Sequence, residues 1–227
     1  MPRIGLQERR TKQRREQREA LRERILEVSR EIVKRDGFAS LSMRKLAEAI
    51  DYSPAALYLH FRSRGEIARA LRLEGHARLR EAFVAHTTIA DPAARLNAMA
   101  RGYVEFGLAE PEIYRLMFME PSALADAAAD GADKPAEFGA ATLSLIADAF
   151  VELRAADRLP PHAVPSARAE GLWANLHGIV ALKLNGASLP ETPVATLVEL
   201  SLAAWSAPAH ETELRTESAN RPDTSTR

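Results

Sequence analysis

Apolar residues along most of the chain recur every three or four positions, the spacing that places side chains on one face of an α-helix. The first such stripe consists of Leu21, Ile25, Val28 and Ile32. Asp36-Gly37 follows it as a stop signal, because glycine readily adopts the left-handed backbone that ends a helix. No segment shows the alternation of apolar and polar residues typical of a strand, and no repeat is found. The pattern predicts an all-α protein.

Two short helices joined by a tight turn are predicted within residues 41–64. The apolar face of the first consists of Leu46, Ala47 and Ile50. Ser53-Pro54 begins the second, because a serine hydroxyl can accept from the unpaired N–H groups of a first turn and proline lacks one such group. Two compact helices at this spacing are typical of a helix-turn-helix, whose second helix enters the major groove of DNA.

The second helix has an inner and an outer side at 100° per residue. Leu57 and Phe61 fall together and should pack on the first helix. The outer side carries Ala55, Ala56, Leu59 and His60, with Tyr58 on its flank. Small residues there let the backbone approach base edges, and Leu59 could touch a thymine methyl group. An ordinary helical hairpin, with Leu59 as a scattered surface residue, is the alternative.

Polar and basic side chains around the motif suit contacts with DNA. Tyr58 and His60 can hydrogen-bond phosphates or bases. Positive charge at the edges comes from Arg44, Lys45, Arg62 and Arg64.

At these residues the sequence resembles the tetracycline-repressor (TetR) family of bacterial transcription regulators. The shared residues are Arg44-Lys45-Leu46-Ala47 and Leu57-Tyr58-Leu59-His60-Phe61, flanked by Gly37-Phe38 and Ser63-Arg64-Gly65-Glu66. The resemblance implies DNA contacts by Ser42, Arg44, Ser53, Pro54, Ala55, Ala56, Tyr58, His60 and Arg64. Asp51 departs from the pattern, since the family usually has glycine in this turn. Aspartate tolerates left-handed geometry, so the turn should survive.

Charge is distributed unevenly along the chain of 227 residues. Residues 1–80 contain 20 basic and 11 acidic side chains, a balance of +9, whereas residues 81–227 contain 11 and 20, a balance of −9. The formal net charge of zero therefore hides a basic first third, which indicates a polyanionic partner. We interpret residues 1–20 as a flexible basic arm that can be helical near Arg18. Such an arm either reaches a minor groove or phosphates, or adds only non-specific attraction.

The helical pattern continues beyond the motif. Ser63-x-x-Glu66 is a capping box that opens a helix to about Thr87. Later helices are predicted from Pro92, from Pro111, through Leu143 to Leu153, from Ser166 to Gly186, and from Pro193 to Trp205. The organisation that follows is a three-helix DNA-binding head in residues 21–70, a helical effector-binding and dimerisation body in 71–207, a weakly helical loop in 123–133 and a disordered tail in 208–227.

The carboxy-terminal half carries a second, less specific likeness. Trp173, His177 and Gly178 have the Trp-x-x-x-His-Gly spacing found in one TetR subgroup. The family resemblance implies that the last two long helices pair with those of a second copy. A homodimer is also expected because one helix-turn-helix reads few base pairs, whereas a twofold dimer reads a palindromic operator in double-stranded DNA.

A small-molecule effector pocket is a further hypothesis. The candidate lining residues are Tyr103, Phe106, Met117, Phe118, Phe150, Trp173 and His177. Aromatic and methionine residues at helical spacing are more often simply core, and His177 on an apolar helix is more often a satisfied buried histidine. A pocket with this lining would bind a mostly apolar effector, which the sequence does not name.

Other classes of protein find little support in the sequence. It has no phosphate-binding loop, no His-Glu-x-x-His pair and no nucleophile elbow, so an enzyme is not expected. Its histidines do not cluster at metal-ligand spacing and it has no cysteine, so no metal or cofactor is expected. A charged amino terminus without a signal peptide and the lack of a long apolar run favour a cytoplasmic protein, associated with the nucleoid when bound to DNA.

We therefore expect a dimeric, ligand-responsive, sequence-specific regulator of transcription that acts as a repressor. A helical enzyme and an architectural protein that binds DNA without sequence preference are the competing hypotheses.

Overall fold

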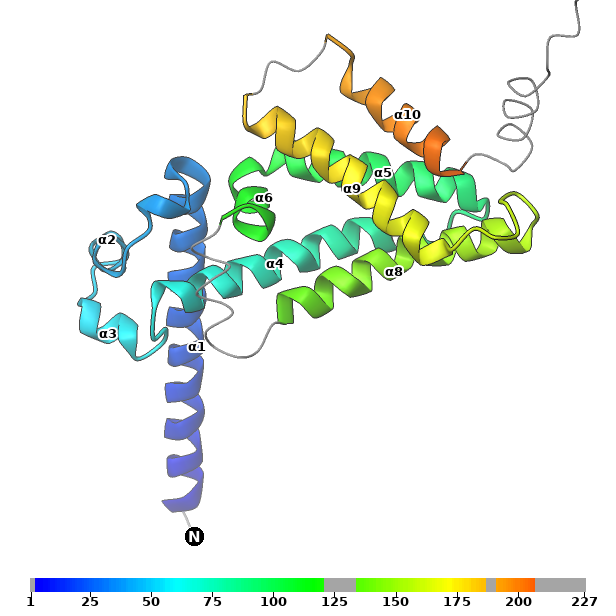
Figure 1. Ribbon diagram of the computed structural model, residues 1–227. Helices are drawn as coiled ribbons and strands as arrows, with labels where there is room; N and C mark the ends of the chain where they lie inside the picture. The colour runs from blue at the N-terminus through cyan, green and yellow to red at the C-terminus, as the bar shows by residue number, and fades with distance from the viewer. Residues whose placement is uncertain (1–2, 121–133, 187–190, 207–227) are drawn as a thin grey trace, which may run out of the picture. The chain divides into compact units, whose positions relative to one another are not determined.

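The computed structural model describes residues 3–120, 134–186 and 191–206, with side chains placed from Glu8 in the first range and from Gly139 in the second. Every regular element in these ranges is helical, so the expected all-α class is confirmed (Figure 1). The chain divides into a head unit, Met1–Arg78 with Glu110–Phe138, and a body unit, Leu79–Ala109 with Gly139–Arg227. The expected loop 123–133 and tail 208–227 lie outside the described residues.

The head unit contains the predicted helix-turn-helix. Its elements are α1 (Arg3–Asp36), the 3-10 turn η1 (Phe38–Ser40), α2 (Met43–Ala49), α3 (Pro54–Tyr58), the first part of α4 (Arg64–Val84) and α6 (Pro111–Phe118). Both α2 and α6 pack against α1, and α2 packs against α3. The sequence placed everything after residue 70 in the body. In the structure α6 groups with the head, where it packs against α1 and against Gly75 of α4.

The segment expected to be a flexible arm, with helix near Arg18, is described as part of α1, which is continuous from Arg3. The exposed early part of α1 buries little apolar surface. Ion pairs one turn apart support it instead, at 3.8 Å between Lys12 and Glu16 and at 2.8 Å between Arg15 and Glu19. The mixed charges of this segment therefore stabilise a helix.

Caps and special backbone conformations define the short helices as predicted. Gly37 has a φ of 77° after α1, and Asp51 has a φ of 57° in the turn between α2 and α3. Aspartate thus occupies the left-handed position where glycine was the usual choice. The Ser63 hydroxyl accepts from the Glu66 N–H at 3.2 Å, and the Glu66 carboxylate accepts from the Arg62 N–H at 2.7 Å. The capping box closes one residue earlier than its standard form.

Two features tie α4 to other elements within the head unit. Glu110, directly before α6, pairs with Lys34 of α1 at 2.8 Å and with Arg78 of α4 at 2.6 Å. Gly75 of α4 faces α6 so closely that an added Cβ would lie 2.5 Å from the Met117 sulfur. The glycine therefore allows α6 to pack directly on the backbone of α4.

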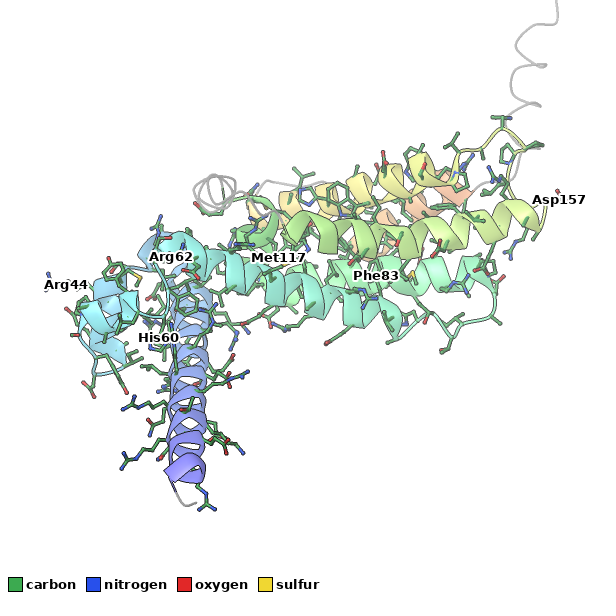
Figure 2. All side chains as sticks on the ribbon, turned by 90° about the horizontal axis from the view of Figure 1, so that it is seen from below. Arg44, His60, Arg62, Phe83, Met117 and Asp157 are labelled. Atoms are coloured by element: carbon green, nitrogen blue, oxygen red, sulfur yellow. The ribbon has the colours of Figure 1, made fainter. Side chains whose placement is uncertain are left out.

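The body unit is a helical bundle with its own core. Besides the end of α4 it contains α5 (Pro92–Ala109), most of α8 (Lys134–Ala155), α9 (Pro165–Leu184) and α10 (Val194–Ser206). Helices α5, α9 and α10 pack against one another. Phe83, Tyr103 and Phe150 are almost completely buried, and the rings of Phe83 and Tyr103 lie 6.5 Å apart, edge to face. Figure 2 shows Phe83 among the side chains of this unit.

A second close approach joins α9 to α10. An added Cβ on Gly171 would lie 2.2 Å from the Trp205 ring, so the indole lies directly on the α9 backbone. Arg168 also donates to the Trp205 carbonyl. These contacts fix the end of α10 within the body unit.

In the described ranges, none of the helices is both long enough and apolar enough to cross a membrane.

Candidate nucleic-acid interface

The short helix α3 presents one side to the protein and the other to solvent. Leu57 and Phe61 are completely buried, as predicted. On the outer side Ala55 is exposed, Tyr58 is 51% exposed and Leu59 is 72% exposed. A strongly exposed leucine beside a small residue and a phenol leaves a low, mixed surface that can approach base edges.

Hydrogen bonds fix the beginning of α3. The Ser53 hydroxyl accepts from the Ala56 N–H at 3.2 Å, and Pro54 occupies the first turn. Pro54 is exposed and Ala56 is half-buried. The predicted serine cap and proline start are therefore confirmed, and the polar group assigned to DNA contact at Ser53 also orders the helix.

The helix ends earlier than the predicted Ser53-to-His60 segment. Its last helical residue is Tyr58, and Leu59 and His60 lie in a turn. The Leu59 N–H bonds the Ala56 carbonyl at 3.3 Å, and the His60 N–H bonds the Leu57 carbonyl at 2.9 Å. These bonds reach back three residues and tighten the last turn, which leaves the Leu59 and His60 carbonyls available to other donors.

Helix α2 contributes an exposed cation and a second serine cap. Ser42 accepts from the Lys45 N–H at 3.1 Å. Arg44 lies at the outer edge of α2 (Figure 2), with 86% of its side chain exposed, and it pairs with Glu48 on the next turn at 2.9 Å. Lys45 instead pairs with Asp36 at 2.8 Å. Hydrogen bonds from Arg35 and then from Lys45 lower the pKa of Asp36 well below its usual value.

Arg62 and Arg64 differ in their surroundings, although the sequence placed both at the edge of the motif. Arg62 is exposed and Arg64 is half-buried. The Arg64 guanidinium carbon lies 4.5 Å from the centre of the Phe38 ring. Such a cation–π contact links the start of α4 to η1 and holds the arginine in place.

The sequence did not predict that α1 reaches the end of α3. Arg18 donates to the Leu59 carbonyl at 3.2 Å, and Arg22 donates to the His60 carbonyl at 2.8 Å. His60 is consequently half-buried rather than fully turned to solvent. Burial, and then the charges of Arg18 and Arg22, lower its pKa. The available signal was the spacing of these two arginines, which extends the helical period of α1 toward its amino terminus.

Two family models match this chain. Residues 25–71 match the family model described as bacterial regulatory proteins, tetR family, and residues 96–205 match that of the tetracyclin repressor-like C-terminal domain. The chain belongs to the tetR family. It is therefore a DNA-binding transcriptional regulator, and its helix-turn-helix is the DNA-binding head.

Solved structures show the same fold. A protein of unknown function from Rhodococcus sp. RHA1 is 30% identical, with a TM-score of 0.68 over 82% of this chain and 93% of that one. A tetR-family regulatory protein from Rhodococcus RHA1 is 21% identical, with a TM-score of 0.61 over 83% and 97%. AibR, in complex with isovaleryl coenzyme A and operator DNA, is 18% identical, with a TM-score of 0.57 over 82% and 98%. A comparison with curated proteins finds no match.

In this tetR-family chain, the residues expected to line an effector pocket are divided between the two units. Met117 and Phe118 lie on α6 in the head, and the Phe118 ring contacts those of Tyr114 at 4.9 Å and His76 at 5.3 Å. Met117 is buried and Phe118 is half-buried. These contacts are those of a packed core.

The other five candidates lie in the body unit. Tyr103 and Phe150 are buried and Phe106 is half-buried. Trp173 and His177 are stacked with ring centres 5.5 Å apart. Burial lowers the pKa of His177, which favours its neutral imidazole form. It stays a prediction that the seven candidate residues line a pocket for one effector.

Among the described residues, no group of three acidic, histidine or cysteine side chains is arranged to hold a metal ion.

Proposed function

We propose that this tetR-family regulator is a repressor that binds a palindromic operator as a homodimer and is released by a small-molecule effector. The observation that carries the proposal is the exposed outer side of α3, formed by Ala55, Tyr58 and Leu59, beside the exposed Arg44. Its caps hold α3 in one orientation, which a helix that reads base edges requires. We expect the protein in the cytoplasm, associated with the nucleoid when bound to DNA.

Two kinds of contact would have separate effects on DNA binding. Base contacts from the outer side of α3 would determine sequence preference, with Leu59 suited to a thymine methyl group and Tyr58 to a hydrogen bond. Phosphate contacts from Ser42, Arg44 and Arg64 would contribute affinity and its dependence on salt. Ser42 and Ser53 would in addition hold the helices that they cap.

The proposed dimer uses the surface of α9 and α10. A groove of about 570 Å³ between these helices is lined mainly by small and apolar side chains: Ala174, Asn175, Gly178, Ile179, Leu182, Leu197, Leu200 and Ser201. Leu182 is 46% exposed and Leu200 is 59% exposed. Apolar side chains that protrude next to an apolar groove favour a second copy of the same surface, which twofold symmetry makes self-complementary.

The effector would act through its different affinity for two states of the dimer. A ligand that binds the DNA-free state more tightly shifts the population toward that state and lowers the occupancy of the operator. The neighbour AibR, crystallised with isovaleryl coenzyme A and operator DNA, supports a ligand-responsive mechanism. The aromatic and methionine residues of the candidate set favour an effector with an apolar portion.

The proposal is tested by incubating the full chain with labelled DNA from upstream of its own gene. A complex that survives excess random duplex, with a footprint containing two inverted half-sites, is expected. Half-sites should be centred about 10 base pairs apart or a multiple of this. Equal competition by random duplex would instead indicate an architectural protein. A promoter fusion that becomes less active when the regulator is supplied would support repression, and a more active one would contradict it.

A further inference from the structure

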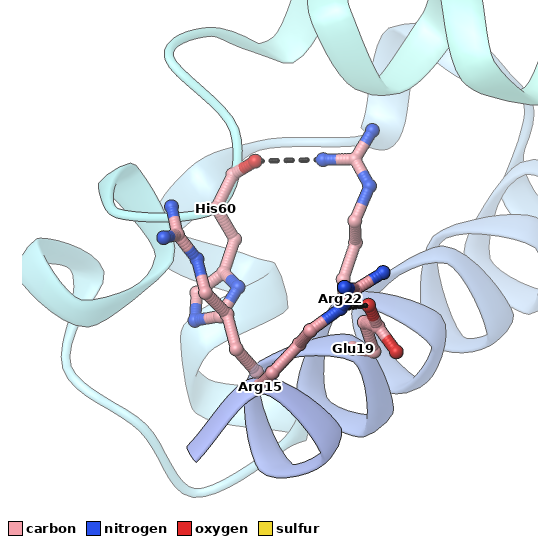
Figure 3. Close-up of a pocket in the computed structure, with 5 residues that line it drawn as sticks. Arg15, Glu19, Arg22 and His60 are labelled. Atoms are coloured by element: carbon pink, nitrogen blue, oxygen red, sulfur yellow. Dashed lines mark hydrogen bonds and ion pairs between the residues drawn. The ribbon is translucent and has the colours of Figure 1, made fainter. Parts of the chain in front are cut away.

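The amino-terminal part of α1 and the end of α3 enclose a basic pocket. Its volume is about 320 Å³, and it is lined by Arg15, Arg18, Glu19, Arg22 and His60. Figure 3 shows α1 supplying Arg15, Glu19 and Arg22, with His60 supplied by the segment after α3. Arg15, Arg18 and Arg22 are spaced by three and four residues, so they lie on one face of α1.

Charge makes this pocket suitable for an anion. The pocket is lined by three guanidinium groups and by one carboxylate, that of Glu19. The Glu19 carboxylate accepts a hydrogen bond from Arg15 at 2.8 Å. Burial, and then the charges of Arg18 and Arg22, lower the pKa of His60, so its neutral form is favoured beside these arginines. A planar guanidinium with five N–H donors matches the oxygens of a phosphate group particularly well.

The place of the pocket in the head unit indicates where the phosphate would come from. Arg18 and Arg22 already donate to the carbonyls of Leu59 and His60, the two residues directly after α3. Arg22 also lies 4.0 Å over the ring of the buried Phe61, which restricts its movement. A duplex with α3 in its major groove carries a line of phosphates along each edge of that groove. A pocket at the end of α3 can therefore meet one of them.

We propose that Arg15, Arg18, Arg22 and His60 form a phosphate site that binds the DNA backbone at the edge of the groove occupied by α3. Arg15 is the direct contact, and Arg18 and Arg22 also position the end of α3. The inference rests on the proposed DNA binding. It adds that α1, outside the helix-turn-helix, fixes the register of the recognition helix by holding a phosphate.

The first test measures the operator affinity of the full chain as a function of salt. The Arg15→Gln variant should retain its fold, because 79% of the side chain is exposed, and should bind the operator on the order of tenfold more weakly. The slope of log K against log salt should fall by about one. Arg14→Gln is the matched control, since it removes the same charge from an exposed neighbour that does not line the pocket. Equal losses in both variants would overturn the site in favour of general attraction.

A second pair of variants reverses the sign of the effect. Glu19→Gln removes the carboxylate of the pocket and releases Arg15, so operator affinity should rise several-fold. The control Glu23→Gln removes an exposed carboxylate of the same helix that does not line the pocket, and should change affinity much less. A loss of affinity in Glu19→Gln would show that the pair with Arg15 only supports α1, and would overturn the proposal.

A third measurement distinguishes DNA from a small phosphate compound. The His60 imidazole resonances should shift when operator duplex is added to the wild-type protein, and shift less in Arg15→Gln. Inorganic pyrophosphate serves as the competing probe. A shift with pyrophosphate but none with duplex would overturn the assignment to the DNA backbone. Failure of the proposed function itself would look different, because the wild-type protein would then show no preference for any operator.

Discussion

Arg78 and Glu110 are joined by a hydrogen bond of 2.6 Å between Nη2 and Oε1, although they are 32 residues apart in the chain. Lys34 reaches the same carboxylate at 2.8 Å, so a single acidic side chain connects α1, α4 and the start of α6. Only 15% of the Glu110 side chain is exposed. Burial by itself would raise its pKa, but the hydrogen bonds from Arg78 and Lys34 lower it below the usual 4.5.

The variant Glu110→Gln should lower the free energy of unfolding at pH 7 by about 1–3 kcal/mol, because it leaves two cations without their shared carboxylate. Because the pKa of Glu110 is lower in the folded protein than the usual 4.5, its carboxylate stabilises the fold fully above pH 4.5. This stabilisation is lost as the pH falls through the lowered pKa of the folded state. The difference between wild type and variant should therefore shrink in acid. Urea unfolding at pH 7 and below pH 4 measures both quantities.

Glu48→Gln provides the control for this prediction. It removes another carboxylate of the head unit, but one that is 64% exposed and paired only within α2. The loss should be much smaller, because water screens an exposed pair. Equal losses in the two variants would contradict a special role for Glu110.

Gly171→Ala should destabilise the body unit by about 1–3 kcal/mol through overpacking. The new methyl group would lie 2.2 Å from the Trp205 ring, and the indole would have to move away from α9. Gly102→Ala is the matched control in α5, because its methyl group would meet only His86, at 3.6 Å. The control should be neutral or slightly stabilising, since alanine is the better helix former. Thermal unfolding monitored by circular dichroism compares them, and a stable Gly171→Ala protein would refute the close packing.

Asp51→Gly should stabilise the head unit by about 0.5–1 kcal/mol. Asp51 has a φ of 57°, which glycine adopts without steric cost. Asp51→Ala keeps the Cβ and should be no more stable than wild type. Chemical unfolding distinguishes the two substitutions, and a destabilised glycine variant would indicate that the aspartate side chain supports the turn.

Arg44→Ala should weaken operator binding on the order of tenfold without lowering the melting temperature, because its guanidinium is exposed and its ion pair with Glu48 lies at the surface. Lys183→Ala, an exposed position on α9, should leave binding unchanged. Fluorescence anisotropy with operator duplex measures the effect. Unchanged affinity in Arg44→Ala would remove this residue from the interface.

Leu200→Glu should convert the proposed dimer into monomers, because a carboxylate in an apolar interface would be buried without a partner. Val151→Glu is the control, since it places the same charge on a 45% exposed apolar position of α8, outside the α9–α10 groove. Sedimentation velocity of both variants and the wild type gives the oligomeric state. A dimeric Leu200→Glu protein would place the interface elsewhere.

Local patterns in the sequence predicted the helices and the helix-turn-helix because their causes lie within a few residues. Ser53 caps the helix that directly follows it, and Leu57 and Phe61 lie on its buried side at helical spacing. Asp51 forms the turn through its own backbone conformation. The family resemblance then supplied the function, while the contact residues it implied, from Ser42 to Arg64, stay predictions.

The contacts that could not be predicted join distant residues without a matching pattern. Arg18 and Arg22 bind backbone carbonyls about forty residues away, and every residue carries such a carbonyl. Nothing in the sequence therefore identified their partners. The Trp205 ring similarly packs on the α9 backbone at Gly171, where a side chain would be in the way. In the sequence, Gly171 does not differ from any other glycine in a helix. These long-range contacts need coordinates.

The contact between Gly75 and Met117 has a consequence for oxidative damage. The chain has no cysteine, so methionines are its oxidisable sulfur atoms. Met117 is buried, and its sulfur packs closely against α4 at Gly75. Peroxide should therefore react with it mainly when α6 separates from α4. The rate at which Met117 gains sixteen mass units would report how often these two helices open.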